Sequence, residues 1–183
     1  MSASAHPAPP VFFRPPSDHD LSRICALEAA GYPLDEAASP SQLEFRLREA
    51  PELFLVAEGP DSSVVAYACG TACHGSSLTH ESMSSHDPEG STLALHSVCV
   101  AAKHRRQGLA TRLLKAYIQY VQVTAPQIST MVLLCKDHLV ALYEGAGFGL
   151  IGPSSVVHGQ DVWLEMRLDF SDSADGLDWC VGA

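Results

Sequence analysis

Apolar residues follow two different spacings along this chain, and the spacings predict where strands and helices lie. Runs in which almost every position is apolar are typical of strands buried in a sheet. Apolar residues three or four positions apart, behind a residue that can cap the first turn, are typical of helices. The predicted strands are Val11–Arg14, Leu53–Glu58, Val64–Cys73, Leu93–Val100, Thr130–Cys135, Phe148–Val157 and Val162–Leu168. The predicted helices are Asp18–Ala29, Ser39–Glu49, Gln107–Val123 and Leu139–Gly145.

The order of these elements predicts the fold class. One strand is followed by two helices, three strands, a helix, a strand, a further helix and two closing strands. Such an order is typical of an α+β domain built on one sheet. The polar stretch from His74 to Gly90 is long for a connection inside a compact domain, so we expect either a functional loop or a short helix there.

Length and composition indicate one domain with two tails. The 183 residues, 46% of them hydrophobic, are enough to form one core. Residues 1–10 are small and rich in proline, and residues 171–183 are polar and acidic. Segments of this composition have little to bury, so we expect a disordered first tail and a flexible second one. The predicted domain therefore spans residues 11–170.

The net charge of −10 narrows the class of partner. A protein that binds nucleic acid needs a basic surface to displace counterions, so nucleic acid is excluded as the main partner. A cationic small molecule fits the charge better, because it is attracted over a distance. No apolar run approaches the roughly 20 residues that span a bilayer, and the first residues lack the basic-then-apolar order of a secretory signal. We therefore expect a cytoplasmic protein without a membrane partner.

Cysteines and histidines give no sign of a disulfide framework or a metal site. The six cysteines have no paired spacing, and most lie in apolar runs, where a free thiol packs as a small hydrophobe. The nine histidines form neither an H-x₃-H nor an H-E-x-x-H pattern. We expect reduced, structural cysteines and no metal.

The most distinctive motif is the turn Arg105–Ala110, between an apolar strand and a helix. Gly108 can adopt a positive φ, and Gly108 and Ala110 both let a ligand approach the main chain. The first N–H groups of a helix have no intrahelical partner and can bind an anion. Five of the 11 Lys and Arg residues lie at positions 103–115. The turn matches neither the P-loop nor the dinucleotide pattern, so we predict a phosphate-binding turn of another kind; the alternative is a solvated helix start with an ordinary basic face.

This turn and three other segments carry a resemblance to a known family. Its R-x-x-G-x-A pattern matches the hallmark of the GCN5-related N-acetyltransferases. Three more segments, in the right order, are similar to the arylalkylamine N-acetyltransferase branch: Leu78–Met83, Leu95–Val100 and Leu139–Pro153. The resemblance covers about residues 13–168. It implies a mixed, mostly antiparallel, twisted sheet of about seven strands flanked by about four helices.

The resemblance also implies the acetyl donor, acetyl-CoA, and the residues that bind it. The pyrophosphate would lie on the main chain of residues 106–111, and the pantetheine would pair with main-chain groups of Val98 and Val100. The N–H of Val98 would polarise the thioester carbonyl. The cofactor-binding residues implied in this way are Val98, Cys99, Val100, Arg105, Arg106, Gln107, Gly108, Leu109, Ala110, Thr111 and Phe148.

Acetyl transfer to an amine needs a group that accepts the amine proton, since an alkylamine has a pKa near that of lysine, roughly 10. His96, in the central predicted strand, titrates in a suitable range. The alternative is a core histidine satisfied by a backbone carbonyl, but His96 matches a catalytic histidine of the arylalkylamine branch. Animal members of that branch have a second histidine where this chain has Ala94. We therefore expect an altered proton path, in which a bound water or another side chain takes part.

Tyr143 is the predicted general acid, which protonates the CoA sulfur. It matches the tyrosine that this fold commonly places in the corresponding helix; the alternative is a packing role. Three residues are predicted to contact the acceptor: Glu81 in the long loop, and Leu134 and Cys135 at the end of a strand. A solvated surface is the alternative for the loop. A cysteine nucleophile has no supporting His/Asp pattern, so we expect direct attack in a ternary complex.

The predicted function is therefore transfer of acetyl to the primary amine of a small molecule. The acceptor would be an arylalkylamine such as serotonin, tryptamine or phenylethylamine, or else a polyamine. Two alternatives stay open: acetylation of protein N-termini or lysines, and a non-catalytic acyl-CoA-binding module, which Ala94 would permit. The sequence decides neither the preferred amine nor the oligomeric state.

Overall fold

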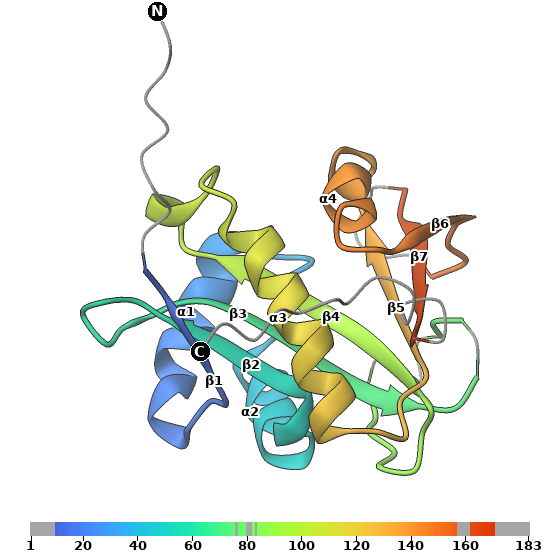
Figure 1. The fold of residues 1–183 in the computed structure, drawn as a ribbon, viewed down its shortest axis with the longest axis horizontal. Helices are drawn as coiled ribbons and strands as arrows, with labels where there is room; N and C mark the ends of the chain where they lie inside the picture. The colour runs from blue at the N-terminus through green and yellow to red at the C-terminus, as the bar shows by residue number, and fades with distance from the viewer. Residues whose placement is uncertain (1–9, 76, 80–81, 83, 157–161, 171–183) are drawn as a thin grey trace, which may run out of the picture.

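Seven strands form one twisted, mixed sheet in the order β1-β2-β3-β4-β5-β7-β6 (Figure 1). The computed structural model describes residues 10–75, 77–79, 82, 84–156 and 162–170. All neighbouring strands run antiparallel except β4 and β5, which are parallel. The predicted α+β class is therefore confirmed. The strands are β1 Phe12–Arg14, β2 Phe54–Glu58, β3 Val64–Cys73, β4 Thr92–Val100, β5 Thr130–Cys135, β6 Gly149–Pro153 and β7 Leu164–Asp169.

In the described residues, four α-helices flank the sheet, two on each side. They are α1 Leu21–Gly31, α2 Pro40–Glu49, α3 Leu109–Thr124 and α4 Val140–Glu144. Helices α1 and α2 cover one face, whereas α3 lies across the other (Figure 1). In the part of the chain that the structure describes, no helix is long and apolar enough to cross a membrane. The tails expected at residues 1–10 and 171–183 lie outside the described residues, apart from Pro10.

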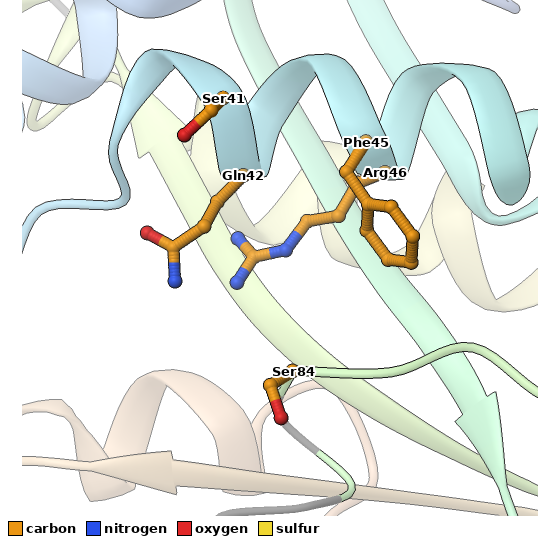
Figure 2. A pocket seen from close by; sticks show the side chains of 5 residues that line it. All are labelled: Ser41, Gln42, Phe45, Arg46 and Ser84. Carbon is orange, nitrogen blue, oxygen red and sulfur yellow. The ribbon is translucent and has the colours of Figure 1, made fainter.

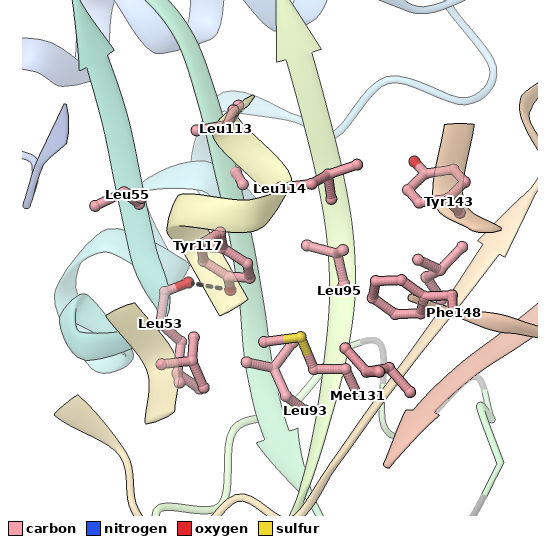
Figure 3. Close-up of a cluster of buried hydrophobic side chains, with 14 of the residues drawn as sticks. Leu53, Leu55, Leu93, Leu95, Leu113, Leu114, Tyr117, Met131, Tyr143 and Phe148 are labelled. Atoms are coloured by element: carbon pink, nitrogen blue, oxygen red, sulfur yellow. Dashed lines mark hydrogen bonds between the residues drawn. The ribbon is translucent and has the colours of Figure 1, made fainter. Parts of the chain in front are cut away.

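The larger core lies between α3 and the sheet (Figure 3). Leu113, Leu114 and Tyr117 of α3 are fully buried there. The Tyr117 hydroxyl donates to the carbonyl of Leu53 at 2.7 Å, so this large side chain leaves no polar atom unpaired. Burial of each leucine contributes about 1.5–3 kcal/mol to the stability of the fold. This packing holds α3, and with it the predicted turn at its start, against the sheet.

Local signals explain where the helices begin. The Ser39 hydroxyl accepts the N–H of Gln42 at 3.3 Å, and the Gln42 side chain accepts the N–H of Ser39 at 2.8 Å. This capping box, with Pro40 in the first turn, confirms the start predicted for α2. The helix predicted from Asp18 instead opens with a 3₁₀ turn, Asp18–Asp20, because Asp20 turns back to accept the N–H of Ser17.

The end of the chain departs more from the prediction. A 3₁₀ turn, Asp137–Leu139, precedes α4, so the helix proper begins at Val140. Strand β6 ends at Pro153 rather than at Val157. It shifts register between Leu150 and Gly152, where φ is 144°, a conformation that favours glycine.

The sheet opens between β4 and β5. Their parallel pairing joins Thr92–Leu95 to Thr130–Leu133 and goes no further, although β4 continues to Val100. At the same point β4 carries a bulge on its other side: Cys69 pairs with Ser97 and Gly70 with Leu95, so His96 is the extra residue. Both features place main-chain and side-chain groups of β4 at an open edge in the middle of the molecule.

Candidate active site

The turn between β4 and α3 presents unpaired main-chain donors. Arg106 has a φ of 60° and Gly108 a φ of 75°, so two left-handed residues flank Gln107. Among the described residues, none accepts a hydrogen bond from the N–H groups of Arg106, Gln107 or Gly108. The first turn of α3 continues this row, because its N–H groups have no intrahelical acceptor. Such a concave row of N–H groups binds anions.

Cations surround the turn in two different ways. Arg105 folds back, and its Nε donates to the carbonyl of Val100 at 2.9 Å, so this side chain fixes the turn to the end of β4. Lys103 and Arg106 are exposed. A pocket of about 290 Å³ lies between the turn and α1, and Arg23, Lys103 and Arg105 are its charged lining residues. The turn and the pocket together form a positive surface in an otherwise acidic protein.

Tyr32 is hydrogen-bonded to main-chain groups of β4 at the opening between β4 and β5. Its hydroxyl accepts the N–H of Val98 at 3.1 Å and donates to the carbonyl of the same residue at 3.1 Å. Tyr32 follows α1 directly and precedes Pro33, which favours the extended backbone observed there. Burial and the neighbouring Tyr143 raise the pKa of Tyr32. Sequence reasoning missed this residue; a tyrosine before a proline at a helix end was the only available signal.

Tyr143 approaches the opening from the other side. It lies in α4, is 7% exposed, and packs edge-on against Phe148 with ring centroids 6.0 Å apart. Figure 3 shows its hydroxyl turned toward β4. Burial raises the pKa of Tyr143, so the phenol stays protonated at neutral pH and can donate a proton. The position is suited to the role that the sequence predicts for this residue.

His96 belongs to a short chain of hydrogen bonds. Its Nε2 lies 2.7 Å from Oγ1 of Thr71, and that hydroxyl also donates to the carbonyl of Ser82 at 3.2 Å. Because the single Thr71 proton goes to Ser82, Oγ1 accepts from Nε2–H of His96. Sequence reasoning did not single out Thr71, since its partner lies 25 positions away.

The residues predicted to contact the acceptor are not all placed. Glu81 lies outside the described residues. Leu134 is half-buried and packs on a small cluster that contains Ala94, and Cys135 is buried at the end of β5, where burial raises its thiol pKa to about 11. Ala94 is fully buried against Cys73, with Leu78 and Val132 in the same cluster. Aliphatic packing therefore surrounds the position at which the related branch has its second histidine.

The thiols fit the structural role expected of them. Cys25, Cys69, Cys73, Cys99 and Cys135 are free, and burial raises the pKa of each. A thiol with a raised pKa is a poor nucleophile at neutral pH. Cys99 donates to the carbonyl of Leu27 at 3.1 Å, so its side chain faces α1.

Comparison with known proteins assigns the class. Residues 21–148 match the model of the acetyltransferase (GNAT) family, which covers more than half of the chain, so the chain belongs to this family. The structure is similar to a GNAT-like decarboxylase, GphF, in complex with isobutyryl-CoA (TM-score 0.75, 20% identity, 86% of this chain and 98% of that one). It is also similar to a phosphinothricin acetyltransferase from Sinorhizobium meliloti in complex with acetyl-CoA (TM-score 0.65, 15% identity, 87% and 88%).

Within the family, the chain falls in the arylalkylamine branch. It is 31% identical over 165 residues to serotonin N-acetyltransferase of Mesocricetus auratus, across 88% of this chain and 79% of that enzyme. The resemblance drawn from the four segments is thereby confirmed. The chain is an N-acetyltransferase, and its co-substrate is acetyl-CoA.

Proposed function

We propose that this enzyme transfers acetyl from acetyl-CoA to the primary amine of a small molecule, an arylalkylamine or a polyamine. The observation that carries the proposal is the arrangement around the β4–β5 opening. Main-chain groups of Val98 are bonded to Tyr32, which has the protonated Tyr143 as a neighbour, and the His96–Thr71 pair lies two positions earlier in the same strand. A donor, an acceptor of protons and a free strand edge are what acyl transfer from a thioester requires.

The residues present fit an acyl-CoA. The N–H row from Arg106 into α3 and the exposed Lys103 and Arg106 suit a pyrophosphate. The edge of β4 beyond Leu95 lacks a strand partner on the β5 side, which suits the amide groups of a pantetheine. When bound, the cofactor supplies an acetyl group already activated as a thioester.

Each group at the opening has a role in this proposal. The N–H of Val98 stabilises the oxyanion once the Tyr32 hydroxyl has moved away from it. Tyr143 donates a proton to the leaving thiolate, and its raised pKa keeps that proton available. His96 accepts the proton of the attacking amine, with Thr71 holding the ring, and because Ala94 carries no second imidazole the path includes water.

Two observations support a small amine as the acceptor. The net charge of −10 attracts cations over a distance, and the relative from Mesocricetus auratus is named for serotonin. Both aromatic monoamines and polyamines meet the charge criterion. Their relative turnover is therefore the quantity to measure.

The test is release of CoA thiol from acetyl-CoA in the presence of serotonin, tryptamine, phenylethylamine, spermidine and short peptides with free N-termini. We expect at least one free amine to raise the rate well above that of acetyl-CoA alone. The proposal is abandoned if no free amine does so, or if a peptide is acetylated faster than every free amine.

A further inference from the structure

Helix α2 places a guanidinium where a hydrophobic side chain is expected. Arg46 lies on the face of α2 that packs on the sheet, between the buried Leu43 and Leu47, and is itself only 6% exposed. Arginine is almost never buried to this extent unless it is paired, because removing its charge from water is costly. We therefore expect an anionic partner for the Arg46 guanidinium.

The described part of the chain supplies no anion for this charge. Nη1 of Arg46 is buried and has no hydrogen-bond partner there, and none of the ion pairs between described residues includes Arg46. The neighbouring Cys69 does not serve, since burial raises its thiol pKa to about 11. Glu28 is also buried, but its carboxylate already accepts from Tyr67, Ser97 and the N–H of Ala38.

A small pocket borders the Arg46 side chain, whose Nη1 has no hydrogen-bond partner among the described residues. Its volume is about 140 Å³, and it is lined by Ser41, Gln42, Phe45, Arg46 and Ser84. Figure 2 shows Gln42 and Arg46 extending from α2 toward Ser84 on the opposite wall. Two hydroxyls, an amide and a guanidinium around an aromatic ring suit a small planar anion, because guanidinium pairs with carboxylate through two parallel hydrogen bonds.

The pocket lies on the same face of the sheet as His96. Arg46 adjoins Cys69, and Thr71, which holds His96, is the next residue of β3 to point to that face. Residues two apart in a strand are separated by roughly 7 Å. The other wall is also close, since Ser84 follows two positions after Ser82, whose carbonyl accepts from Thr71.

We propose that this pocket, called here the Arg46 pocket, binds a carboxylate of the acceptor. The acceptor class is then an amine that carries a carboxylate several bonds away from its nitrogen, with the amine at His96 and the carboxylate at Arg46. The inference rests on the proposed function and narrows it. A polyamine is disfavoured, because its second ammonium would lie near an uncompensated guanidinium.

The experiment compares two acceptors that differ only in charge, 4-(2-aminoethyl)benzoate and 4-(2-aminoethyl)benzamide. For the wild-type enzyme we expect kcat/KM for the carboxylate to exceed that for the amide about tenfold, the equivalent of about 1.4 kcal/mol. In Arg46→Gln the ratio falls to about one through a higher KM for the carboxylate. Arg48→Gln is the matched control, because Arg48 is exposed on the same helix and pairs with Glu49.

A binding measurement separates this inference from the proposed function. Binding of 4-ethylbenzoate and 4-ethylbenzamide, which cannot be acetylated, is measured by calorimetry and needs no turnover. Arg46→Lys replaces Arg46→Gln as the variant if Arg46→Gln does not fold. Tighter binding of the benzoate that weakens in the Arg46 variant supports the pocket, even if no amine is acetylated. Equal kcat/KM and equal binding of each pair, in an enzyme that does acetylate amines, overturns the inference and leaves the proposed function standing.

Discussion

The two ends of the site are built in different ways. At the cofactor end, the donors are main-chain N–H groups of consecutive residues, shaped by the positive φ of Arg106 and Gly108. At the acceptor end, the groups are side chains from three elements and the segment after α1: Thr71, His96, Tyr143 and Tyr32. The cofactor end is formed by one short segment of chain, whereas the acceptor end exists only once the sheet has formed.

The two ends also differ in how far their groups are already engaged. The N–H groups of Arg106, Gln107 and Gly108 donate to no described residue, but the N–H and carbonyl of Val98 are both bonded to the Tyr32 hydroxyl. A ligand at the turn therefore meets free donors, while a ligand at Val98 has to displace a hydrogen-bonded group. Variants at the two ends are expected to have different kinetic signatures.

The largest effect is expected from Tyr143→Phe at the acceptor end. Loss of a general acid lowers kcat about 100-fold, while KM for acetyl-CoA stays close to the wild-type value. Because burial raises the pKa of Tyr143, the wild-type enzyme should also show no loss of activity from tyrosine ionisation up to about pH 10, the ordinary value. Steady-state thiol release as a function of pH measures both. Tyr120→Phe, which removes the hydroxyl of a half-buried tyrosine of α3, is the control, and an equal loss of kcat there would refute the assignment.

Thr71→Val should have the next largest effect. It keeps the shape of a fully buried side chain but removes the hydroxyl that holds His96, so kcat/KM for the amine falls about tenfold, the effect of about 1.4 kcal/mol. The acid limb of the pH profile of kcat/KM should shift, which a loss of packing alone would not cause. Thr71→Ser restores the hydroxyl and should recover most of the rate. A profile of unchanged shape in the valine variant counts against a positioning role.

At the cofactor end, Gly108→Ala should raise KM for acetyl-CoA about fivefold and leave kcat nearly unchanged. The new Cβ meets no atom within 4 Å, so the effect comes from the left-handed φ of 75°, which costs an alanine about 1 kcal/mol. Gly75→Ala is the matched control, since Gly75 has a φ of 104°, equally open surroundings and a place away from the turn. Equal changes of KM in both variants would show that the turn has no special part in cofactor binding.

The smallest effect, and one of opposite sign, is expected from Tyr32→Phe. The ring remains but the hydroxyl no longer competes for Val98, so acetyl-CoA should bind about threefold more tightly, the equivalent of roughly 0.6 kcal/mol. Isothermal titration with CoA and acetyl-CoA measures the change. Weaker binding would mean that the hydroxyl is a ligand contact rather than a competitor.

The comparison also explains what could be predicted from the sequence. Signals that lie within a few residues of one another predicted correctly: the Ser39 cap of α2, the apolar runs of β3 and β5, and the strand-to-helix turn before α3. Predicted helix boundaries were wrong where a contact with a distant segment changed the first turn. Asp20, for example, is hydrogen-bonded to Arg14, and a 3₁₀ turn precedes α1.

Site residues were missed for the same reason. Thr71 contacts His96 across the β3–β4 pair, and Tyr32 contacts Val98 over 66 positions. Arg46 became a candidate only because α2 buries it against the sheet. The first contact depends on sheet register and on the bulge at His96, and the other two depend on how helices pack on the sheet, which local spacing does not encode. His96 and Tyr143 could be proposed from the sequence because a family resemblance replaced that missing spatial information.

The short pairing between β4 and β5, called here the seam, suggests where the enzyme can be divided into two fragments. Among the described residues, β4 and β5 pair only through Thr92–Leu95 and Thr130–Leu133, and the link between α3 and β5 crosses at that seam. Val98 and His96 lie on the first part and Tyr143 on the second, so a chain cut between Ala125 and Thr130 yields two fragments that each hold half of the chemistry. Acetyl transfer would then report directly on fragment reassembly.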